Sequence, residues 1–332
     1  MTDSAACDLS VADIQAAHAR IQQYVVRTPL LESEALNCLA GARVLVKAEN
    51  LQKTGSFKYR GACNRVLQMT DEQRPLGIVA FSSGNHALAI SAVCARLGMK
   101  ATIVMPSDAP RAKIDGVRNY GATVRLFDRR ADDREAIARD IAERTGAVTV
   151  PPYDDPRIMA GQGTIGLEIV QQLQEIGATA EIVLAAAGGG GLIAGVATAI
   201  HAQCAQARIY AVEPAGFDDT ARSLAEGKQV SNAPGAQSIC DSLQTISPGE
   251  LTFPINKRLL SGSLVVDDNE VRRAMRVAFD TLKLVVEPGG VTPLAAVLSG
   301  KADVSGKTVV LVASGGNVDA DVFRTALAQA VS

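Results

Sequence analysis

Apolar residues in the middle of the chain form short runs, and each run is followed by a longer segment with helical spacing of apolar positions. Three such units in succession indicate a parallel sheet with helices on its faces. The pattern predicts strands at Ile78–Phe81, Ala101–Met105 and Thr123–Leu126, and helices at Asn85–Leu97, after Pro110 and at Ala131–Arg144.

A second α/β region follows a break at Pro151-Pro152. Before the first region, Ser10 and Asp13 have the spacing of a capping box, which predicts a helix to about Tyr24. Residues 228–262 have no clear period and are expected to form an ordered loop region. The remaining predicted strands are Val44–Ala48, Ile182–Ala186, Arg208–Glu213 and Thr308–Ala313, and the remaining helices lie near Gly161–Gln174, from Leu192, from Asp267 and from about Val318.

The composition is that of an ordinary soluble protein. The 332 residues are 47% hydrophobic and 20% charged with net charge −2, so no basic excess indicates nucleic acid. The apolar stretch Ile182–Ile200 is interrupted by four glycines, which argues against a membrane span. The cysteines are scattered without a metal-binding pattern and predict reduced, mostly buried thiols in a cytoplasmic protein: Cys7, Cys38, Cys63, Cys94, Cys204 and Cys240.

Lys58 is the first candidate for chemistry. It lies in the segment Thr54–Ala62, next to Phe57 and Tyr59. An environment that removes water from an ammonium group lowers its pKa and leaves an amine that can attack a carbonyl, as a Schiff-base lysine does. The alternative is a surface lysine at the start of a helix, and the lysine alone favours neither.

Three glycine-rich turns lie where a strand leads into a helix. Gly188–Gly191 favours phosphate binding over a simple tight turn, because four glycines let backbone amides approach an anion. Ser82–His86 can cradle a carboxylate, or can simply cap a helix, and His86 has no acidic partner nearby in sequence. Ser314–Asn317 repeats the pattern, and ligands of open parallel sheets bind at this carboxyl edge, so the turns are expected to converge.

The segment Glu213–Asp219 offers oxygen ligands for a divalent cation after a strand. On the residues alone, a solvated acidic loop before a helix at Thr220 is the favoured interpretation.

Taken together, these motifs resemble the fold-type II pyridoxal-phosphate enzymes of the threonine/serine dehydratase and serine racemase group. The resemblance follows the order of the motifs along nearly the whole chain. They are Lys47–Lys58, Ser82–His86, Ala160–Thr164, Gly188–Gly191, Val286–Gly290 and Ser314–Asn317.

The resemblance implies roles for individual residues. Lys58 would hold the cofactor covalently, Phe57 would pack on its ring and Asn85 would bond its phenolic oxygen. The amides of Gly188, Gly189, Gly190, Gly191 and Leu192 would bind the phosphate, and Ser314 would face the ring nitrogen. Substrate would contact Ser82, Ser83, Gly84, Asn85 and His86. Ser83 would be a catalytic residue on the face opposite Lys58, and Arg134 would contact a second carboxylate.

The resemblance also implies a metal site in the acidic segment. Glu213, Asp219 and the carbonyl of Phe217 would bind Mg²⁺ or Ca²⁺, so the resemblance favours a metal site here over a solvated acidic loop.

The resemblance also implies a two-domain α/β fold like that of tryptophan synthase β. Residues 1–70 plus 154–332 would form a large cofactor-binding domain, and residues 71–153 a small mobile domain on the substrate side. A cytoplasmic homodimer is expected. The sequence departs from the family at Ala87–Ala89, which puts nucleotide activation in doubt, and at Ser242, where the family favours glycine.

A serine at the ring nitrogen makes the cofactor a weaker electron sink than an aspartate would, which favours prompt loss of a β-leaving group. The predicted activity is therefore β-elimination from a β-hydroxy amino acid such as L-threonine or L-serine, giving a 2-oxo acid and ammonia. Hydroxyaspartate dehydratase and serine racemase remain alternatives, and a non-catalytic phosphate- or nucleotide-binding protein is the alternative from another class.

Overall fold

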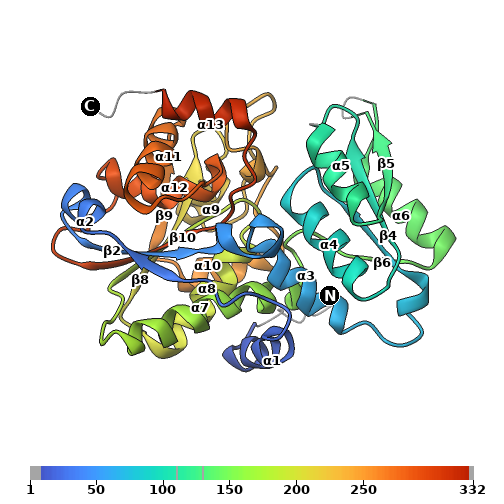
Figure 1. The fold of residues 1–332 in the computed structure, drawn as a ribbon, viewed down its shortest axis with the longest axis horizontal. Helices are drawn as coiled ribbons and strands as arrows, with labels where there is room; N and C mark the ends of the chain where they lie inside the picture. Colours follow the sequence, from blue (N-terminus) through green and yellow to red (C-terminus); the bar gives the residue numbers. More distant parts are fainter. Residues whose placement is uncertain (1–8, 110, 129–130, 329–332) are drawn as a thin grey trace.

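The computed structural model describes residues 9–109, 111–128 and 131–328, which form two helix-covered sheets lying side by side (Figure 1). The larger sheet has six strands in the order β1-β2-β10-β7-β8-β9, and every neighbouring pair is parallel except β1 and β2. Its strands are β1 (Leu30–Glu32), β2 (Arg43–Ala48), β7 (Ile182–Ala186), β8 (Arg208–Pro214), β9 (Gly262–Val266) and β10 (Thr308–Ala313).

Helices cover both faces of the six-stranded sheet because its strands are apolar on both sides. Val44 and Val46 of β2 belong to the core under one set of helices, whereas Leu45 points to the opposite core. The first face carries α2 (Glu34–Ala40), α11 (Asp268–Leu282), α12 (Pro288–Leu298) and α13 (Ala320–Leu327). The second carries α7 (Pro156–Glu175) and α8 (Gly191–Gln203), against which α1 (Val11–Ile21) and α10 (Thr252–Leu259) pack.

The smaller sheet is fully parallel in the order β5-β4-β3-β6. Its strands are β3 (Ile78–Phe81), β4 (Ala101–Pro106), β5 (Thr123–Phe127) and β6 (Val148–Thr149), and its helices are α4 (Asn85–Arg96), α5 (Arg111–Asn119) and α6 (Arg134–Thr145). Helix α3 (Lys58–Leu67) packs against α7 on one side and α4 on the other, so it joins the two parts of the molecule (Figure 1). The domain boundaries near residues 70 and 153 stay a prediction.

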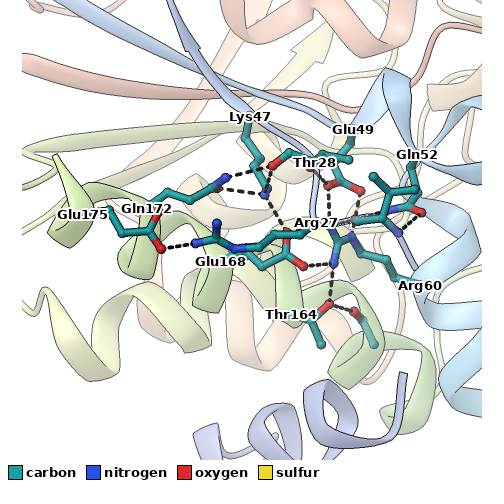
Figure 2. A network of polar contacts seen from close by, with 12 residues as sticks. Arg27, Thr28, Lys47, Glu49, Gln52, Arg60, Thr164, Glu168, Gln172 and Glu175 are labelled. Carbon is teal, nitrogen blue, oxygen red and sulfur yellow. Dashed lines mark hydrogen bonds and ion pairs between the residues drawn. The ribbon is translucent and has the colours of Figure 1, made fainter. Parts of the chain in front are cut away.

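A buried ion network anchors α3 to the larger part (Figure 2). The Arg60 guanidinium pairs with Glu49 and Glu168, each at 2.7 Å, and Lys47 pairs with Glu168 at 2.6 Å. All four side chains are at most 1% exposed. Glu49 lies in the short 3₁₀ helix η1 (Glu49–Leu51) after β2, and Glu168 lies in α7. Because buried charges are tolerated only when paired, the network fixes how α3 sits on these elements.

The sequence pattern located most strands well. The predicted strands at residues 78–81, 182–186 and 308–313 have the observed bounds. The predicted capping box of Ser10 and Asp13 opens α1, and the predicted helix from Asp267 is opened by a second capping box, of Asp267 with Glu270. The structure describes five of the six cysteines, all free, and three of these (Cys63, Cys94 and Cys240) are buried; Cys7 lies outside the described residues.

Three predictions need correction. Helix α7 begins at Pro156, five residues before the predicted start, with Asp155 as its cap. The predicted helix at Ala131–Arg144 begins at Arg134. Asp133 is its N-cap, because the Asp133 carboxylate accepts hydrogen bonds from the backbone amides of Glu135 and Ala136. The predicted loop region 228–262 contains α10 and the 3₁₀ helix η4 (Asp241–Leu243). Pro254 falls in the first turn of α10, where a missing N–H costs nothing, so it does not prevent the helix. Among the described residues, no helix is long and apolar enough to cross a membrane.

Candidate active site

A cavity opens between the two sheets at the carboxyl ends of their strands. It is lined by every residue that the resemblance assigns to cofactor or substrate, whereas none of the three predicted metal ligands lines it. The predicted residues brought together are Phe57, Lys58, Ser82, Ser83, Gly84, Asn85, His86, Arg134, Gly188, Gly189, Gly190, Gly191, Leu192 and Ser314. The three glycine-rich turns thus converge on one cavity, and the role of each residue in it stays a prediction.

Lys58 is the first residue of α3, and its amine is held inside the cavity. The amine donates a 2.6 Å hydrogen bond to the carbonyl oxygen of Pro152 and lies 5.1 Å from the centre of the Phe57 ring. Burial lowers the pKa of Lys58 to about 8, although the nearby carboxyl of Glu287 acts in the opposite direction. Lys58 does begin a helix, as the alternative interpretation assumed, but its amine is desolvated and not a surface group.

The tetraglycine turn presents its backbone amides at the start of α8. Gly190 has φ +88° and is the N-cap of the helix, a conformation that favours glycine. Among the described residues, no acceptor faces the amides of Gly188, Gly189 and Gly190. Unpaired amides at a helix N-terminus attract an anion, so this turn suits a phosphate group.

The connection from the small sheet to the large one, residues 150–155, contributes to the cavity in a way that the sequence did not reveal. Besides the Pro152 carbonyl, it carries Tyr153, whose ring lies so close to Gly189 that a Cβ there would overlap it. The Asp154 carboxylate accepts hydrogen bonds from the backbone amides of Glu250 and Leu251 at the start of α10. In the sequence, Pro151-Pro152 indicates only the end of the first α/β region. The contact of Tyr153 with Gly189 joins residues far apart in the chain, so no local sequence pattern predicts it.

Glu287 is a second cavity residue that no sequence pattern identifies. It accepts a 2.6 Å hydrogen bond from the Asn85 amide, whose oxygen in turn accepts one of 2.7 Å from Asn317. Burial, followed by the charge of Asp241, raises the pKa of Glu287 to about 8. Its only signal in the sequence is that it is a charged residue within the apolar run Leu284–Pro288. The motif that contains it, Val286–Gly290, contributes to the family resemblance without assigning Glu287 a role.

The Ser82–His86 turn supplies polar groups from the other side of the cavity. The Ser82 hydroxyl accepts a hydrogen bond from the Gly84 amide, and the His86 ring lies 3.0 Å from the Val150 carbonyl oxygen. Burial, and then the positive charge of Lys58, lower the pKa of His86 to about 3, so the ring is neutral. The ring is thus neutral and bonded through one nitrogen to the backbone, and no described carboxylate is bonded to it, in keeping with the absence of an acidic partner nearby in sequence.

Two cationic side chains from the small sheet reach the cavity. The Arg134 guanidinium lies 5.4 Å from the centre of the Phe81 ring. Lys113 of α5 was not predicted, because a lysine within a short amphipathic helix is unremarkable in sequence. Its amine forms a 2.6 Å ion pair with Asp241 of η4, so the pair bridges the two parts of the molecule.

The predicted metal ligands form a separate buried cluster. Glu213 accepts hydrogen bonds from the amides of Thr220 and Ala221 and from the Ser263 hydroxyl, and so caps α9 (Asp219–Glu226). Burial raises the pKa of Glu213 to about 7 and that of Asp219 to about 6. The Asp219 Oδ2 atom is buried and has no partner. Across the described ranges, no three or more His, Cys, Asp or Glu side chains form a metal-binding group, so a cation here would also need carbonyl and water ligands.

The described residues fit pyridoxal phosphate. The unpaired amides of the tetraglycine turn suit its phosphate, and the desolvated Lys58 amine suits its aldehyde carbon. The Ser314 hydroxyl lines the same cavity, and no described group forms a hydrogen bond with it. Two helix-covered, mostly parallel sheets with such a site between them define a fold-type II pyridoxal-phosphate enzyme.

Comparison with known proteins agrees with this class. The family model described as "Pyridoxal-phosphate dependent enzyme" matches residues 21–315, and the chain belongs to this family. Within it, the chain is a fold-type II enzyme of the group that contains serine racemases, threonine deaminases and hydroxyaspartate ammonia-lyases. This confirms the resemblance and the fold class predicted from the sequence.

Individual relatives in this group differ in activity. The chain is 42% identical to a serine racemase of Arabidopsis thaliana, covering 93% of each chain, and 41% identical to an L-threo-3-hydroxyaspartate ammonia-lyase of Pseudomonas sp, covering 96% of this chain and 98% of the relative. Among solved structures, a threonine deaminase from T.th. superposes with a TM-score of 0.88 at 44% identity, covering 93% of this chain and 99% of the other. Maize serine racemase gives a TM-score of 0.90 at 37% identity, covering 96% of each chain.

Proposed function

We propose that this protein is an ammonia-lyase that removes the β-hydroxyl group from a β-hydroxy amino acid, such as L-threonine or L-serine, and yields a 2-oxo acid and ammonia. The observation that carries the proposal is the Lys58 amine, desolvated in the same cavity as three unpaired backbone amides. Pyridoxal phosphate, when bound, supplies the electron sink that makes the α-proton of an amino acid acidic.

The residues of the chain then have distinct tasks. The amine of Lys58 has a pKa of about 8, so about a tenth of it is neutral at pH 7, far more than of an ordinary lysine, and this neutral amine can take the α-proton. The amides and hydroxyls of Ser82–His86 bind the α-carboxylate, and the amides of Gly188–Leu192 bind phosphate. Ser314 would hold the ring nitrogen of the cofactor with a hydroxyl rather than a carboxylate, which would favour elimination over chemistry that needs a long-lived carbanion.

Serine racemase activity is the second candidate, and the placement of Ser83 supports it. Ser83 lines the cavity that also contains Lys58. A hydroxyl on the opposite face of the substrate can return a proton to the α-carbon with inverted configuration, provided that this occurs before the β-hydroxyl leaves. Relatives at about 40% identity include both lyases and racemases, so they support the shared chemistry and leave the balance between the two reactions to experiment.

A substrate panel tests the proposal. The holoenzyme is assayed with L-serine, D-serine, L-threonine and the stereoisomers of 3-hydroxyaspartate, and both 2-oxo acid and inverted amino acid are measured. We expect 2-oxo acid from at least one L-amino acid, together with an absorbance band near roughly 410–420 nm that Lys58→Ala abolishes. Protein that stays colourless with added pyridoxal phosphate would instead support a non-catalytic phosphate- or nucleotide-binding protein.

We also propose a structural Mg²⁺ or Ca²⁺ ion at Glu213, Asp219 and the carbonyl of Phe217. Two buried carboxyl groups that repel each other, one of them with an unpartnered oxygen, support it because a cation would offset this repulsion. Removing the ion with a chelator should lower the melting temperature, and restoring Mg²⁺ or Ca²⁺ should recover it. Unchanged stability and activity after chelation would contradict the metal site. The homodimer and the cytoplasmic location stay predictions.

A further inference from the structure

The Lys113–Asp241 ion pair is part of the cavity lining, and its two members differ in exposure to solvent. The side chain of Lys113 is 15% exposed, whereas that of Asp241 is 57% exposed. Both residues line the cavity that contains Lys58 and Arg134. The Asp241 carboxylate therefore has water on more than half of its surface to turn into, whereas the Lys113 side chain is mostly enclosed by protein.

The charges around Lys113 show that it needs an anionic partner. Burial alone would lower the pKa of Lys113, but Asp241, together with Asp319 and Glu287, raises it above its ordinary value. Among these carboxylates, only Asp241 forms an ion pair with the Lys113 amine. A mostly buried ammonium group that lost this partner would be left uncompensated, which is unfavourable unless another anion replaces it.

The cavity has an excess of positive charge once Asp241 turns away. Among the described lining residues, the cationic side chains besides Lys58 are Lys113 and Arg134. The other lining carboxyl group, that of Glu287, is buried and accepts a hydrogen bond from Asn85. A substrate with only an α-carboxylate would bind the Ser82–His86 turn and leave Lys113 and Arg134 without an anionic partner. A substrate with a second carboxylate, in its side chain, would provide such a partner.

We propose that Lys113 determines substrate preference by binding a carboxylate in the substrate side chain, and that Asp241 occupies this position in the absence of such a substrate. The inference rests on the proposed function and sharpens it. The preferred β-hydroxy amino acid is then an acidic one, such as 3-hydroxyaspartate, and the neutral substrates L-serine and L-threonine are used less efficiently. Exchange of Asp241 for the substrate carboxylate keeps the charge balance at Lys113 unchanged.

Paired kinetics on the holoenzyme test this inference. Lys113→Met should lower kcat/KM for 3-hydroxyaspartate by about 10- to 100-fold more than it lowers kcat/KM for L-serine, because only the acidic substrate loses an ion pair. Lys113→Arg should recover part of the lost preference. Asp241→Asn should lower KM for the acidic substrate, because it removes the competing carboxylate. Arg111→Met is the matched control on the same helix, since the Arg111 side chain is 94% exposed and, within the described part of the chain, its one ion pair is with Asp115 at 3.8 Å.

A binding measurement separates this inference from the proposed function. L-Aspartate and L-asparagine have the same shape and differ in charge, so their ratio of affinities for the holoenzyme, measured by spectral titration, reports the cation directly. We expect L-aspartate to bind more tightly, and Lys113→Met to remove most of the difference. Equal binding by the wild-type protein, or an equal loss of both ligands in Lys113→Met, would overturn the role of Lys113. Absence of turnover on every hydroxy amino acid, with the aspartate preference intact, would overturn only the lyase activity.

Discussion

The amine of Lys58 donates a 2.6 Å hydrogen bond to the backbone carbonyl of Pro152, which lies 94 residues further along the chain. This contact joins the start of α3 to the connection between the two sheets. A carbonyl oxygen accepts a hydrogen bond from either the neutral or the charged amine, so it orients the lysine without fixing its charge. Burial then favours the neutral form, and the same contact keeps the amine directed into the cavity.

The reactivity of Lys58 should follow its lowered pKa. In cofactor-free protein, the rate at which pyridoxal phosphate labels Lys58 should rise with pH and level off above about 8, whereas an exposed lysine would need a pH above 10. At pH 8 about half of Lys58 is neutral, against about 0.3% of a lysine with the ordinary pKa. Borohydride reduction followed by peptide mass spectrometry measures the label, with Lys58→Ala as the control. A midpoint near 10.5 would contradict the desolvation argument.

Gly189 should tolerate no side chain while Tyr153 is present. A Cβ at this position would overlap the Tyr153 ring, so Gly189→Ala must displace either the ring or the turn. Displacing the turn misdirects its unpaired amides, and we expect affinity for pyridoxal phosphate to fall by about 10- to 100-fold, or about 1.4–2.7 kcal/mol. Titration of cofactor absorbance measures this change.

A second substitution tests the cause of that loss. Gly189→Ala combined with Tyr153→Ala should recover part of the affinity, because the smaller side chain leaves space for the new Cβ. Gly188→Ala is the matched control in the same turn, where the nearest atom would be 3.3 Å from the added Cβ, and it should have a smaller effect. If the double variant binds no better than Gly189→Ala alone, the Tyr153 contact is not the reason that the turn requires glycine.

Features of this protein that depend on short-range interactions are predictable from its sequence, and those that depend on distant partners are not. Strands such as Ile182–Ala186 and helix caps such as Ser10 are set by neighbouring residues, so a local pattern predicted them. The three glycine-rich turns converge because parallel strands present their carboxyl ends at one edge, which a topological rule could anticipate. Lys113 and Glu287 have their effects through partners more than 100 residues away, and no local pattern identifies such partners.

Glu287 should make the stability of the cofactor-free protein depend on pH. Its pKa is about 8 in the folded protein and near 4.5 when unfolded, so between these values the folded state binds more protons. Stability from this group is therefore fully present below pH 4.5 and is lost as the pH rises through 8, by at most about 1.4 kcal/mol per pH unit. Glu287→Gln keeps an acceptor for Asn85 and removes the titration.

Thermal unfolding at several pH values tests this linkage. The melting temperature of Glu287→Gln minus that of the wild-type protein should increase between about pH 5 and pH 8. His86 acts in the opposite direction, because its lowered pKa costs stability as the pH falls from 6.5 towards 3, but this contribution is the same in both proteins and cancels in the difference. A difference that stays constant across this range would mean that Glu287 is already ionised at neutral pH.

The buried ion network should be far more sensitive to truncation than the exposed ion pair beside it. Arg60 is fully buried between Glu49 and Glu168, whereas the side chains of Arg27 and Glu175, paired at 2.5 Å, are 47% and 58% exposed (Figure 2). Arg60→Ala leaves two buried carboxylates without their guanidinium partner, and we expect a loss of about 3–5 kcal/mol in the free energy of unfolding. Arg27→Ala breaks an ion pair that water already screens and should cost at most about 1 kcal/mol.

Denaturant unfolding of the cofactor-free variants measures both changes.

A third variant, in which all members of the network are replaced with apolar residues of similar size, separates the effect of charge from that of packing. It should restore stability, because buried ion pairs contribute little net energy. Restoration of stability without restoration of cofactor labelling at Lys58 would show that the network positions α3. Lys58 and Arg60 are two residues apart on that helix, so a small rotation of α3 moves the amine away from the Pro152 carbonyl. Equal losses in Arg60→Ala and Arg27→Ala would instead mean that water reaches the network and screens it.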